Sequence, residues 1–372
     1  MRTALSLLLC CLAACAPYHP PAQPPRLVVA RAPVRVFSEP GAPTLLTVLV
    51  RAGSAYDPPG REGTAFVYAH GVASLGGAAV EVGPELVAFM VPAGGEAALA
   101  SALGTPVSTD LVDAGRAAAA RLEPRTCAAL AGDLVDSWAL AGTPYGHPAQ
   151  GRASVLPTLT PGEVDAFRSL RYVRDAVVVA ADGNVDATAF STLFPPVMSR
   201  AVTPAVRPRE SRPNIVASAP VSAACTVFSP QRLTTWTAAD QGAYLVALEL
   251  AGLPAPPARV DPAAAIQLSG TFAVFVGLPG DVVAARRAVL ARLARPTARW
   301  SAEWTLLGEL RGSRFAAIEG VKQAIEALTE ASLADWLASR FGADAIVVQV
   351  RPTETLESPA SGNVVSSEDL LR

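Results

Sequence analysis

Few side chains in this chain are grouped so that they could do chemistry. The sequence holds three histidines. His19 falls in a proline-rich stretch, and His147 lies in a turn between prolines where we expect it to be exposed. No G-x-S-x-G motif occurs, no cysteine is placed with a histidine in a recognisable nucleophile pattern, and no glycine-rich phosphate loop is present. His70, which lies inside a helical pattern, is therefore the residue whose neighbours decide the chemistry.

Three consecutive elements are expected to position His70. Leu45–Arg51 is an apolar run typical of a buried strand. Asp57–Gly60 reads Asp-Pro-Pro-Gly and breaks the chain in a turn. Glu62–Leu75 then has the composition of a helix, and Ala79–Val82 predicts a further strand after a pair of glycines. His70 is thus expected on a helix that is held between two strands of one sheet.

Three sequence blocks, in this order, resemble the insulinase/pitrilysin-type zinc peptidases, the family that includes the mitochondrial processing peptidases. The first is Arg51–Gly63, which reads R-x-G-S-x-Y-D-P-P-G-R-x-G. The second is Leu75–Ala79, which carries the glycine pair ahead of the strand. The third starts with the P-Y-G of Pro144–Gly146, continues through Gly151, and ends in the apolar strand Ala176–Ala180. Together the blocks cover about residues 27–194.

The metal-binding motif of that family is only partly present here. The family's H-x-x-E-H falls on Phe66–His70, so the resemblance places Phe66 at the first zinc ligand, Ala69 at the general base and His70 at the second ligand. The third family ligand, a glutamate on a later helix, aligns with Ala118–Ala120, and Glu123 is the nearest carboxylate. A zinc hydrolase needs three protein ligands, a water site and a base.

We therefore expect no catalytic residues and no zinc cofactor. A phenyl ring cannot coordinate zinc, and one imidazole with one carboxylate a helical turn out of place does not hold the ion against water. His70 and Glu123 are the only candidates for a metal site, and one alternative remains a metallopeptidase with rearranged ligands. If His70 is not a metal ligand, it is a helix residue in a polar cleft or a hydrogen-bonded histidine of the core.

The first residues predict a lipoprotein signal peptide over 1–15. Arg2 gives a positive start, Ala4–Ala14 is an apolar run too short to span a bilayer, and Leu12–Cys15 resembles a bacterial lipobox with Cys15 as the lipidated residue. Ordinary secretory cleavage is the alternative. Residues 16–25 then form a proline-rich tether. We expect a lipid anchor in the outer membrane, with the chain facing the periplasm.

The remaining chain predicts an α+β fold of two related α/β-sandwich domains that resemble the metallopeptidase half-clam, the second being shorter. The first domain is expected over 26–195 and a linker over 196–213, because the segment 195–213 holds five prolines and four arginines. The second is expected over 214–352, where strands and helices recur in a similar order. The tail, 353–372, is polar and is expected to be disordered.

The amino-acid composition limits the classes of partner that the chain could bind. The chain has 372 residues, 51% of them hydrophobic, and a net charge of −2. Its arginines are dispersed along the chain without interleaved aromatics, so no nucleic-acid surface is indicated. Cys127 and Cys225 either pair in an oxidising compartment or are two buried thiols. Tyr244 lies in an apolar helical run and is expected in the core rather than against a substrate.

These observations lead to a ranked expectation of function. The resemblance implies a catalytically inactive homologue that acts as the structural or substrate-holding partner of a zinc-bearing homologous subunit at the cell envelope, or that forms a homodimer. The alternative is a stand-alone envelope lipoprotein that binds extended peptides along the strand near Ala79 by β-addition.

Overall fold

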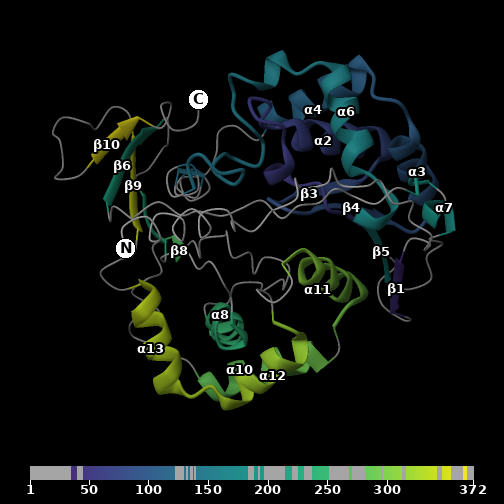
Figure 1. The fold of residues 1–372 in the computed structure, drawn as a ribbon. Coiled ribbons are helices and arrows are strands. Elements are labelled where there is room, and N and C mark those ends of the chain that lie inside the picture. Colours follow the sequence, from purple (N-terminus) through teal and green to yellow (C-terminus); the bar gives the residue numbers. More distant parts are fainter. Residues whose placement is uncertain are drawn as a thin grey trace, which may run out of the picture.

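A computed structural model of the chain contains two five-stranded mixed sheets and two groups of helices (Figure 1). The structure describes residues 35–39, 45–121, 130, 133–134, 137, 140–182, 188–191, 193–196, 214–219, 225–229, 237–250, 268–269, 281–294, 296–311, 316–341, 346–352 and 363–366. The predicted signal peptide, the tether, nearly all of the predicted linker, Cys127 and Glu123 lie outside these residues.

The first sheet has the strand order β1-β5-β2-β4-β3. Its strands are β1 (Arg35–Glu39), β2 (Leu45–Val50), β3 (Ala79–Val82), β4 (Val87–Pro92) and β5 (Val177–Asp182). Strands β1 and β5 run parallel, and the other neighbours run antiparallel. Strand β3 therefore forms one edge of the sheet, as the resemblance implied for the strand near Ala79.

Both faces of the first sheet are buried, which explains its continuous apolar strands. Val48 of β2 and Val179 of β5 belong to the core beneath one helical layer, whereas Leu49 and Val178 belong to a separate cluster on the opposite face. Successive side chains of a strand point to opposite faces. An apolar run such as Val177–Ala181 is thus divided between two cores.

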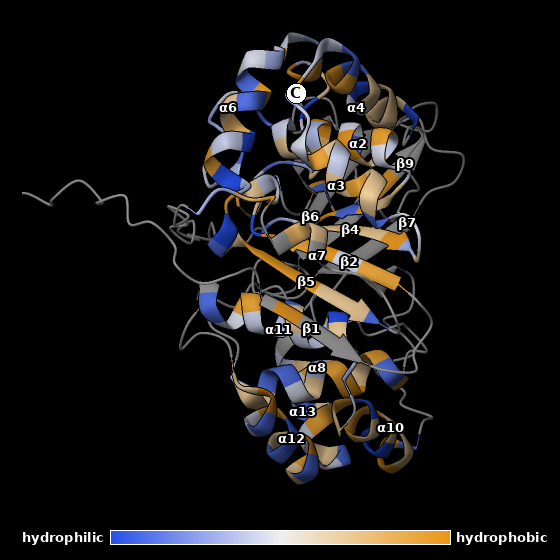
Figure 2. Ribbon diagram, turned by 90° about the vertical axis from the view of Figure 1, so that its right-hand side faces the viewer, coloured by the Kyte–Doolittle hydropathy of each residue, from blue (hydrophilic) through white to orange (hydrophobic). Residues whose placement is uncertain are grey.

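Helices from distant parts of the sequence cover the two faces (Figure 2). One face carries α2 (Thr64–Gly76), α3 (Glu96–Gly104), α4 (Thr109–Arg121) and α6 (Pro161–Arg171). The opposite face carries α11 (Ala298–Arg311), whose Ala302 and Leu306 pack against the sheet. The sequence pattern did not predict α11. Thr297 caps the N-terminus of α11: its hydroxyl accepts a hydrogen bond from the Trp300 backbone N–H at 3.2 Å.

The second sheet repeats the pairing scheme of the first. Its order is β10-β6-β9-β7-β8, and the parallel pair β6–β9 is followed by the antiparallel pairs β9–β7 and β7–β8. The bounds are β6 (Asn214–Ala219), β7 (Cys225–Ser229), β8 (Leu268–Ser269) and β9 (Ile346–Pro352). The set β6-β9-β7-β8 thus matches β1-β5-β2-β4, as expected for two related α+β units.

The second group of helices forms its own core. It comprises α8 (Ala238–Leu250), α10 (Val282–Ala294), α12 (Ile318–Ala327) and α13 (Glu330–Phe341). Tyr244 is buried there, as predicted, and Trp304 and Leu307 of α11 join the same cluster. Helix α11 therefore lies between this core and the first sheet, with one face in each. Within the described residues, no helix combines the length and apolarity needed to cross a membrane.

One expectation from the sequence needs correction. The tail 353–372 was expected to be disordered, but Asn363–Ser366 forms strand β10, which pairs in parallel with β6. An edge strand gains backbone hydrogen bonds from an extended segment that can reach it, which explains the order of this short segment. The division at 196–213 stays a prediction, and α11, from the second half of the chain, covers one face of the first sheet. The short helix α7 (Thr188–Ser191) completes the described elements of the first half.

Candidate functional site

The start of α2 is fixed by a buried carboxylate. Asp57 Oδ2 accepts the Gly63 backbone N–H at 2.6 Å and Oδ1 accepts the Ala65 N–H at 2.7 Å, so Asp57 caps the exposed amides of the helix. Burial raises the pKa of Asp57 to about 8, although both hydrogen bonds act in the opposite direction. The Asp-Pro-Pro-Gly turn is therefore a structural device for starting the helix that carries His70.

Two glycines hold the turn against the loop that carries the third sequence block. Gly63 has φ +102° and Gly151 has φ +83°, a region that favours glycine. A Cβ on Gly151 would lie 2.3 Å from the Glu62 carbonyl oxygen and 2.4 Å from the Gly63 Cα. Both positions belong to the resemblance, and the structure shows why they are glycines: the two backbones are in direct contact.

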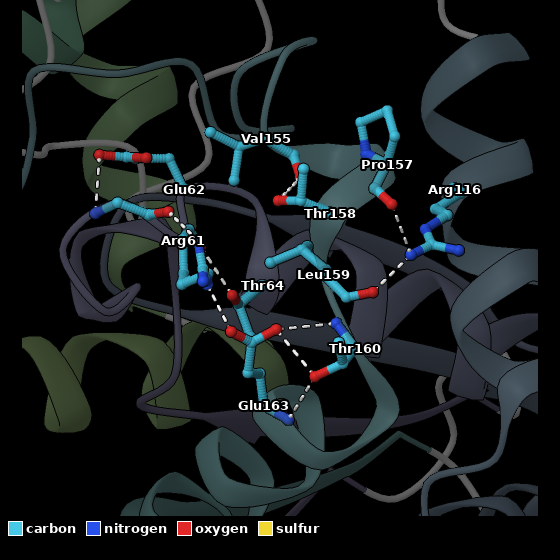
Figure 3. A network of polar contacts seen from close by, with 11 residues as sticks. Arg61, Glu62, Thr64, Arg116, Val155, Pro157, Thr158, Leu159, Thr160 and Glu163 are labelled. Atoms are coloured by element: carbon cyan, nitrogen blue, oxygen red, sulfur yellow. Dashed lines mark hydrogen bonds and ion pairs between the residues drawn. The ribbon is translucent and has the colours of Figure 1, made fainter.

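A polar network fastens the same turn to α6 (Figure 3). Arg61 Nε donates to Glu163 Oε1 at 2.5 Å. The other carboxylate oxygen of Glu163 accepts the Thr160 N–H at 2.8 Å, while the Thr160 hydroxyl accepts the Glu163 N–H at 3.3 Å. These reciprocal hydrogen bonds form a capping box at the start of α6. The backbone N–H of Thr160 and the Arg61 side chain lower the pKa of Glu163 to about 2.

Helices α2 and α4 approach each other with no side chain between them at two points. A Cβ on Gly71 would lie 2.3 Å from the Leu111 carbonyl oxygen, and one on Gly115 would lie 2.1 Å from the Val67 carbonyl oxygen. Close backbone approach of this kind requires glycine. The two glycines therefore allow direct contact between α2 and α4. In the peptidases that the sequence resembles, the corresponding helices would carry the zinc ligands.

Two of the positions that the resemblance assigns to zinc ligands meet in an apolar cluster. Phe66 of α2, at the first ligand position, packs against Ala118 and Ala119 of α4, within the segment aligned with the third. Val82 of β3 and Leu156 pack against the same cluster. We call these five residues the apolar plug. Ala69, at the position of the base, has no exposed surface and belongs to the main core. The structure thus brings the positions of the first and third ligands together without donor atoms.

His70 remains beside the apolar plug. Its ring stacks on the Phe66 ring with a centroid distance of 4.0 Å and an interplanar angle of 28°. Burial, followed by the charge of Arg121, lowers the pKa of His70 to about 4, so the imidazole is neutral near pH 7. A neutral imidazole can act as a ligand, but no group of three histidine, cysteine, aspartate or glutamate side chains able to hold a metal occurs among the described residues. Glu123, the second candidate, lies outside them.

A pocket of about 340 Å³ opens beside the apolar plug. Its lining comes from α4 and from the loop ahead of α6, and comprises Arg116, Ala119, Ala120, Gln150, Gly151, Ala153, Leu156 and Pro157. This volume lies at the lower end of the range for small-molecule and side-chain sites. The pocket shares Ala119 and Leu156 with the apolar plug. The region of the missing zinc ligands therefore keeps a concave surface.

Sequence reasoning missed Arg116, which shapes this pocket. Its guanidinium donates to the Leu156 carbonyl at 3.0 Å. It also donates to the Pro157 carbonyl at 3.2 Å and to the Leu159 carbonyl (Figure 3). A single arginine on α4 therefore fixes the turn η2 (Leu156–Thr158). No local motif signals this contact, because the partners are backbone atoms about 40 residues away in the sequence.

One expectation about a loop residue is wrong. His147 was expected to be an exposed loop residue, but it is partly buried, its Nδ1 lies 3.0 Å from the Pro148 carbonyl oxygen, and burial lowers its pKa. The loop folds back over the Arg51–Gly63 segment, which the sequence spacing could not reveal. Tyr145 of the same block is buried and donates its hydroxyl to Glu85 Oε1 at 2.8 Å.

Comparison with known proteins gives a match in fold and none in sequence. No family model matches this chain, and no curated protein does. Among solved structures, a protease from Helicobacter pylori aligns with a TM-score of 0.64 at 12% identity, over 88% of this chain and 99% of that one. A peptidase M16 inactive domain from Pseudomonas fluorescens aligns with a TM-score of 0.59 at 16% identity, over 88% and 98%. The fold is that of the M16 peptidases.

The M16 fold is that of the insulinase-type peptidases, so the fold expected from the resemblance is confirmed. The periplasmic protease PqqL from Escherichia coli aligns with a TM-score of 0.56 at 14% identity, over 90% of this chain but only 48% of its own length. This chain therefore corresponds to about half of that larger M16-fold protein.

Proposed function

We propose that this chain is a catalytically inactive M16-type homologue that acts as the structural or substrate-holding partner of a zinc-bearing homologous subunit at the cell envelope. The observation that carries this proposal is the apolar plug. Phe66 fills the first ligand position and packs on the two alanines where the third ligand would stand. The scaffold that positions the motif is intact, whereas the donor atoms are missing.

Hydrolysis through a metal needs groups that this site lacks. Besides its three ligands, the zinc water needs a base. Ala69 occupies that position with no exposed surface, and the His70 ring faces Phe66. We therefore assign no catalytic residue, and we expect the purified chain to contain no zinc.

The proposed second subunit is supported by the length of this chain and by the nature of its structural neighbours. The chain spans 48% of the length of PqqL, whose remaining half would correspond to a further unit of the same kind. The neighbour from Pseudomonas fluorescens is itself described as an inactive domain. A homodimer is the other arrangement that would supply a second unit. For the envelope location, support comes from the predicted lipidation site Cys15 and from a neighbour that is periplasmic.

A paired purification tests the partnership. The full chain with Cys15 intact is tagged at its C-terminus, expressed in its own host, cross-linked and purified from the envelope, and a Cys15→Ser variant serves as the matched control for anchoring. We expect a co-purified chain with an intact H-x-x-E-H, stoichiometric zinc in the complex and peptidase activity only in the complex. A chain that purifies alone or as a homodimer, without zinc or activity, contradicts the proposed partnership.

The second candidate function, stand-alone peptide binding, is favoured by strand β3. It pairs only with β4 among the described residues, and its Ala79 and Glu81 are exposed. An open edge can accept an extended peptide through backbone hydrogen bonds. An extended peptide and its copy with alternate backbone N-methyl groups separate the cases: β-addition requires loss of binding on methylation, because donors are removed while side chains stay.

The third candidate, a metallopeptidase with rearranged ligands, is tested by metal analysis. Stoichiometric zinc in the purified chain that is lost in a His70→Ala variant would overturn the assignment of an inactive chain. A Phe66→Leu variant is the control, since it changes the apolar plug without removing a donor.

A further inference from the structure

The side chain of Met90 lies against an arginine of α11. Met90 is on β4, and its side chain is on the sheet face that α11 covers, since Ala88, two residues earlier, packs with Ala302 of that helix. The Arg299 Nη1 nitrogen lies 3.0 Å from the Met90 sulfur. Met90 is partly exposed, so a molecule little larger than water can reach it.

Two carboxylates hold Arg299 in this position. Its Nε donates to Glu303 Oε1 at 2.8 Å, and its Nη2 donates to Glu81 Oε2 at 2.7 Å. The Glu303 side chain is only 4% exposed, so this charge-assisted hydrogen bond is shielded from water. The third nitrogen, Nη1, faces the Met90 sulfur, and a thioether sulfur is a weak hydrogen-bond acceptor. A fixed cationic donor is thus directed at an atom that accepts little from it.

A second donor lies across the strand pair from Met90. Thr47 of β2 is the residue directly opposite Met90 in the antiparallel pair β2–β4. The two side chains are therefore on the same face of the sheet, with a Cβ separation of about 5 Å. Thr47 has no exposed surface, and its hydroxyl has no hydrogen-bond partner in the part of the chain that the structure describes. A buried hydroxyl without a partner destabilises a fold, so Thr47 would gain from an acceptor placed beside it.

We propose that Met90 is a site of reversible oxidation by hydrogen peroxide. The sulfur attacks one peroxide oxygen, the S–O bond forms as the O–O bond breaks, and the departing hydroxide takes the proton of the transferred oxygen and leaves as water. Sulfur loses two electrons and the peroxide gains two. The product is a methionine sulfoxide, whose oxygen is a strong hydrogen-bond acceptor next to the Arg299 guanidinium and the Thr47 hydroxyl.

Oxidation at Met90 should stabilise the fold, which is the reverse of its usual effect. In an apolar core a sulfoxide places a polar oxygen among groups that cannot bind it, and packing is disrupted. At Met90 the oxygen would accept hydrogen bonds from Arg299 on α11 and from Thr47 on β2. The modification would therefore bind α11, from the second half of the chain, more tightly to the first sheet. This role does not depend on the proposed zinc-bearing partner.

Peroxide treatment of the full chain tests the proposal. The chain has three methionines, Met1, Met90 and Met198, and Met198 in the predicted linker is the internal reference. Conversion at each methionine is read by peptide mass spectrometry, and thermal unfolding is followed before and after treatment. We expect Met90 to be converted, the unfolding temperature to rise by about 2 °C, and methionine sulfoxide reductase to reverse both changes. A Met90 that stays reduced while Met198 is oxidised, or a lower unfolding temperature once Met90 is oxidised, would overturn the proposal.

Three variants assign the effect to these side chains. Met90→Leu removes the sulfur and should abolish the rise, which controls for oxidation of cysteines. Thr47→Val keeps the shape of the side chain and should reduce the rise by about half, because one of the two donors is lost. Arg299→Leu combined with Glu303→Leu removes the cation without leaving a buried carboxylate unpaired, and oxidation should then lower the unfolding temperature. A rise that persists in Met90→Leu, or that is unchanged in the other two variants, contradicts the proposal.

Discussion

The His70 ring lies flat on the Phe66 ring one helical turn before it, at a centroid distance of 4.0 Å. In an H-x-x-E-H helix these two positions would point donor nitrogens at one zinc ion. Here the first ring has no donor, and the second is neutral near pH 7 because burial and Arg121 lower its pKa to about 4. The two rings form an aromatic contact, and its contribution to stability can be measured.

The neutral His70 predicts a loss of stability in mild acid. Its pKa in the folded chain, about 4, is below the value of 6.5 in the unfolded chain, so the unfolded state binds protons first as the pH falls. The free energy of unfolding should decrease as the pH falls from about 6.5 to 4 and stay level below that. Urea unfolding at pH 4 to 8, followed by circular dichroism, should show this window in the difference between the native chain and His70→Phe, which keeps the stacked ring.

The difference in stability between the native chain and His70→Phe also removes the contribution of other titrating residues. The pKa of His147 is also lowered by burial, so His147 contributes to the pH dependence of both proteins and cancels in the difference. A difference that is flat between pH 4 and 6.5 would mean that His70 has the same pKa in the folded and the unfolded chain.

The apolar plug predicts that Phe66 acts in stability rather than in catalysis. Truncation of a buried phenylalanine costs about 3 to 5 kcal/mol, since apolar contacts are lost and a cavity is left. Phe66→Ala should lower the free energy of unfolding by about 3 kcal/mol, and Phe66→Leu, which nearly conserves volume, by about 1 kcal/mol. Zinc content should stay at the background level in both. If Phe66→Ala unfolds at the same urea concentration as the native chain, the ring is not part of a packed cluster.

The motif region could be predicted from sequence because its restraints are local. Asp57 caps the helix eight residues later, and Thr160 and Glu163 form a capping box within one turn. The absence of donors at Phe66 and Ala69 was likewise visible in the residue types. The contact of Phe66 with Ala118 is consistent with the ordered resemblance, which assigned both segments to the same metal.

Contacts between distant segments could not be predicted in the same way. Arg116 binds backbone carbonyls, which no residue pattern reveals. Helix α11 was missed because its apolar residues are divided between two cores, so it shows no single hydrophobic face. Strand β10 has only four residues, and it is ordered by pairing with β6. In each case the deciding term is tertiary packing or pairing rather than local propensity.

Crowding at Gly151 predicts a large effect of adding one methyl group. Gly60 and Gly151 both have positive φ, +74° and +83°, but a Cβ on Gly60 would meet nothing within 4 Å. Gly60→Ala should therefore cost only the conformational strain, about 1 to 2 kcal/mol. Gly151→Ala should cost about 2 kcal/mol more, because the loop must leave the Gly63 backbone. Equal costs in urea unfolding would show that the two loops separate easily.

The bond between Arg61 and Glu163 predicts a second pH dependence, at lower pH. The pKa of Glu163 is lowered from 4.5 to about 2, chiefly by the Thr160 N–H and the Arg61 side chain. Stabilisation by the carboxylate is present above pH 4.5 and is lost as the pH falls toward 2. The stability difference between the native chain and Glu163→Gln should disappear over that interval. Arg61→Met should change little further in the Glu163→Gln background, and additive effects would contradict the pairing.

The position of α11 predicts that the first sheet depends on the second half of the chain. Ala302 has no exposed surface, and it packs with Leu49 and Val178 across a long sequence separation. Ala302→Asp would bury a carboxylate there, and we expect a loss of at least about 3 kcal/mol in the free energy of unfolding. Ala334→Asp, on the exposed face of α13, is the matched control and should cost less than about 0.5 kcal/mol.

Hydrogen exchange shows where the Ala302 effect is felt. Since α11 covers the sheet face formed by β2 and β5, the amides of Val177–Asp182 should lose protection in Ala302→Asp together with those of α11 itself. The Ala298 N–H also donates to Asp182 Oδ1 at 3.1 Å, which joins the start of α11 directly to the end of β5. If the β5 amides keep their protection while the α11 amides lose it, the first sheet is stable without α11. The chain would then divide into two units at the predicted boundary, 196–213.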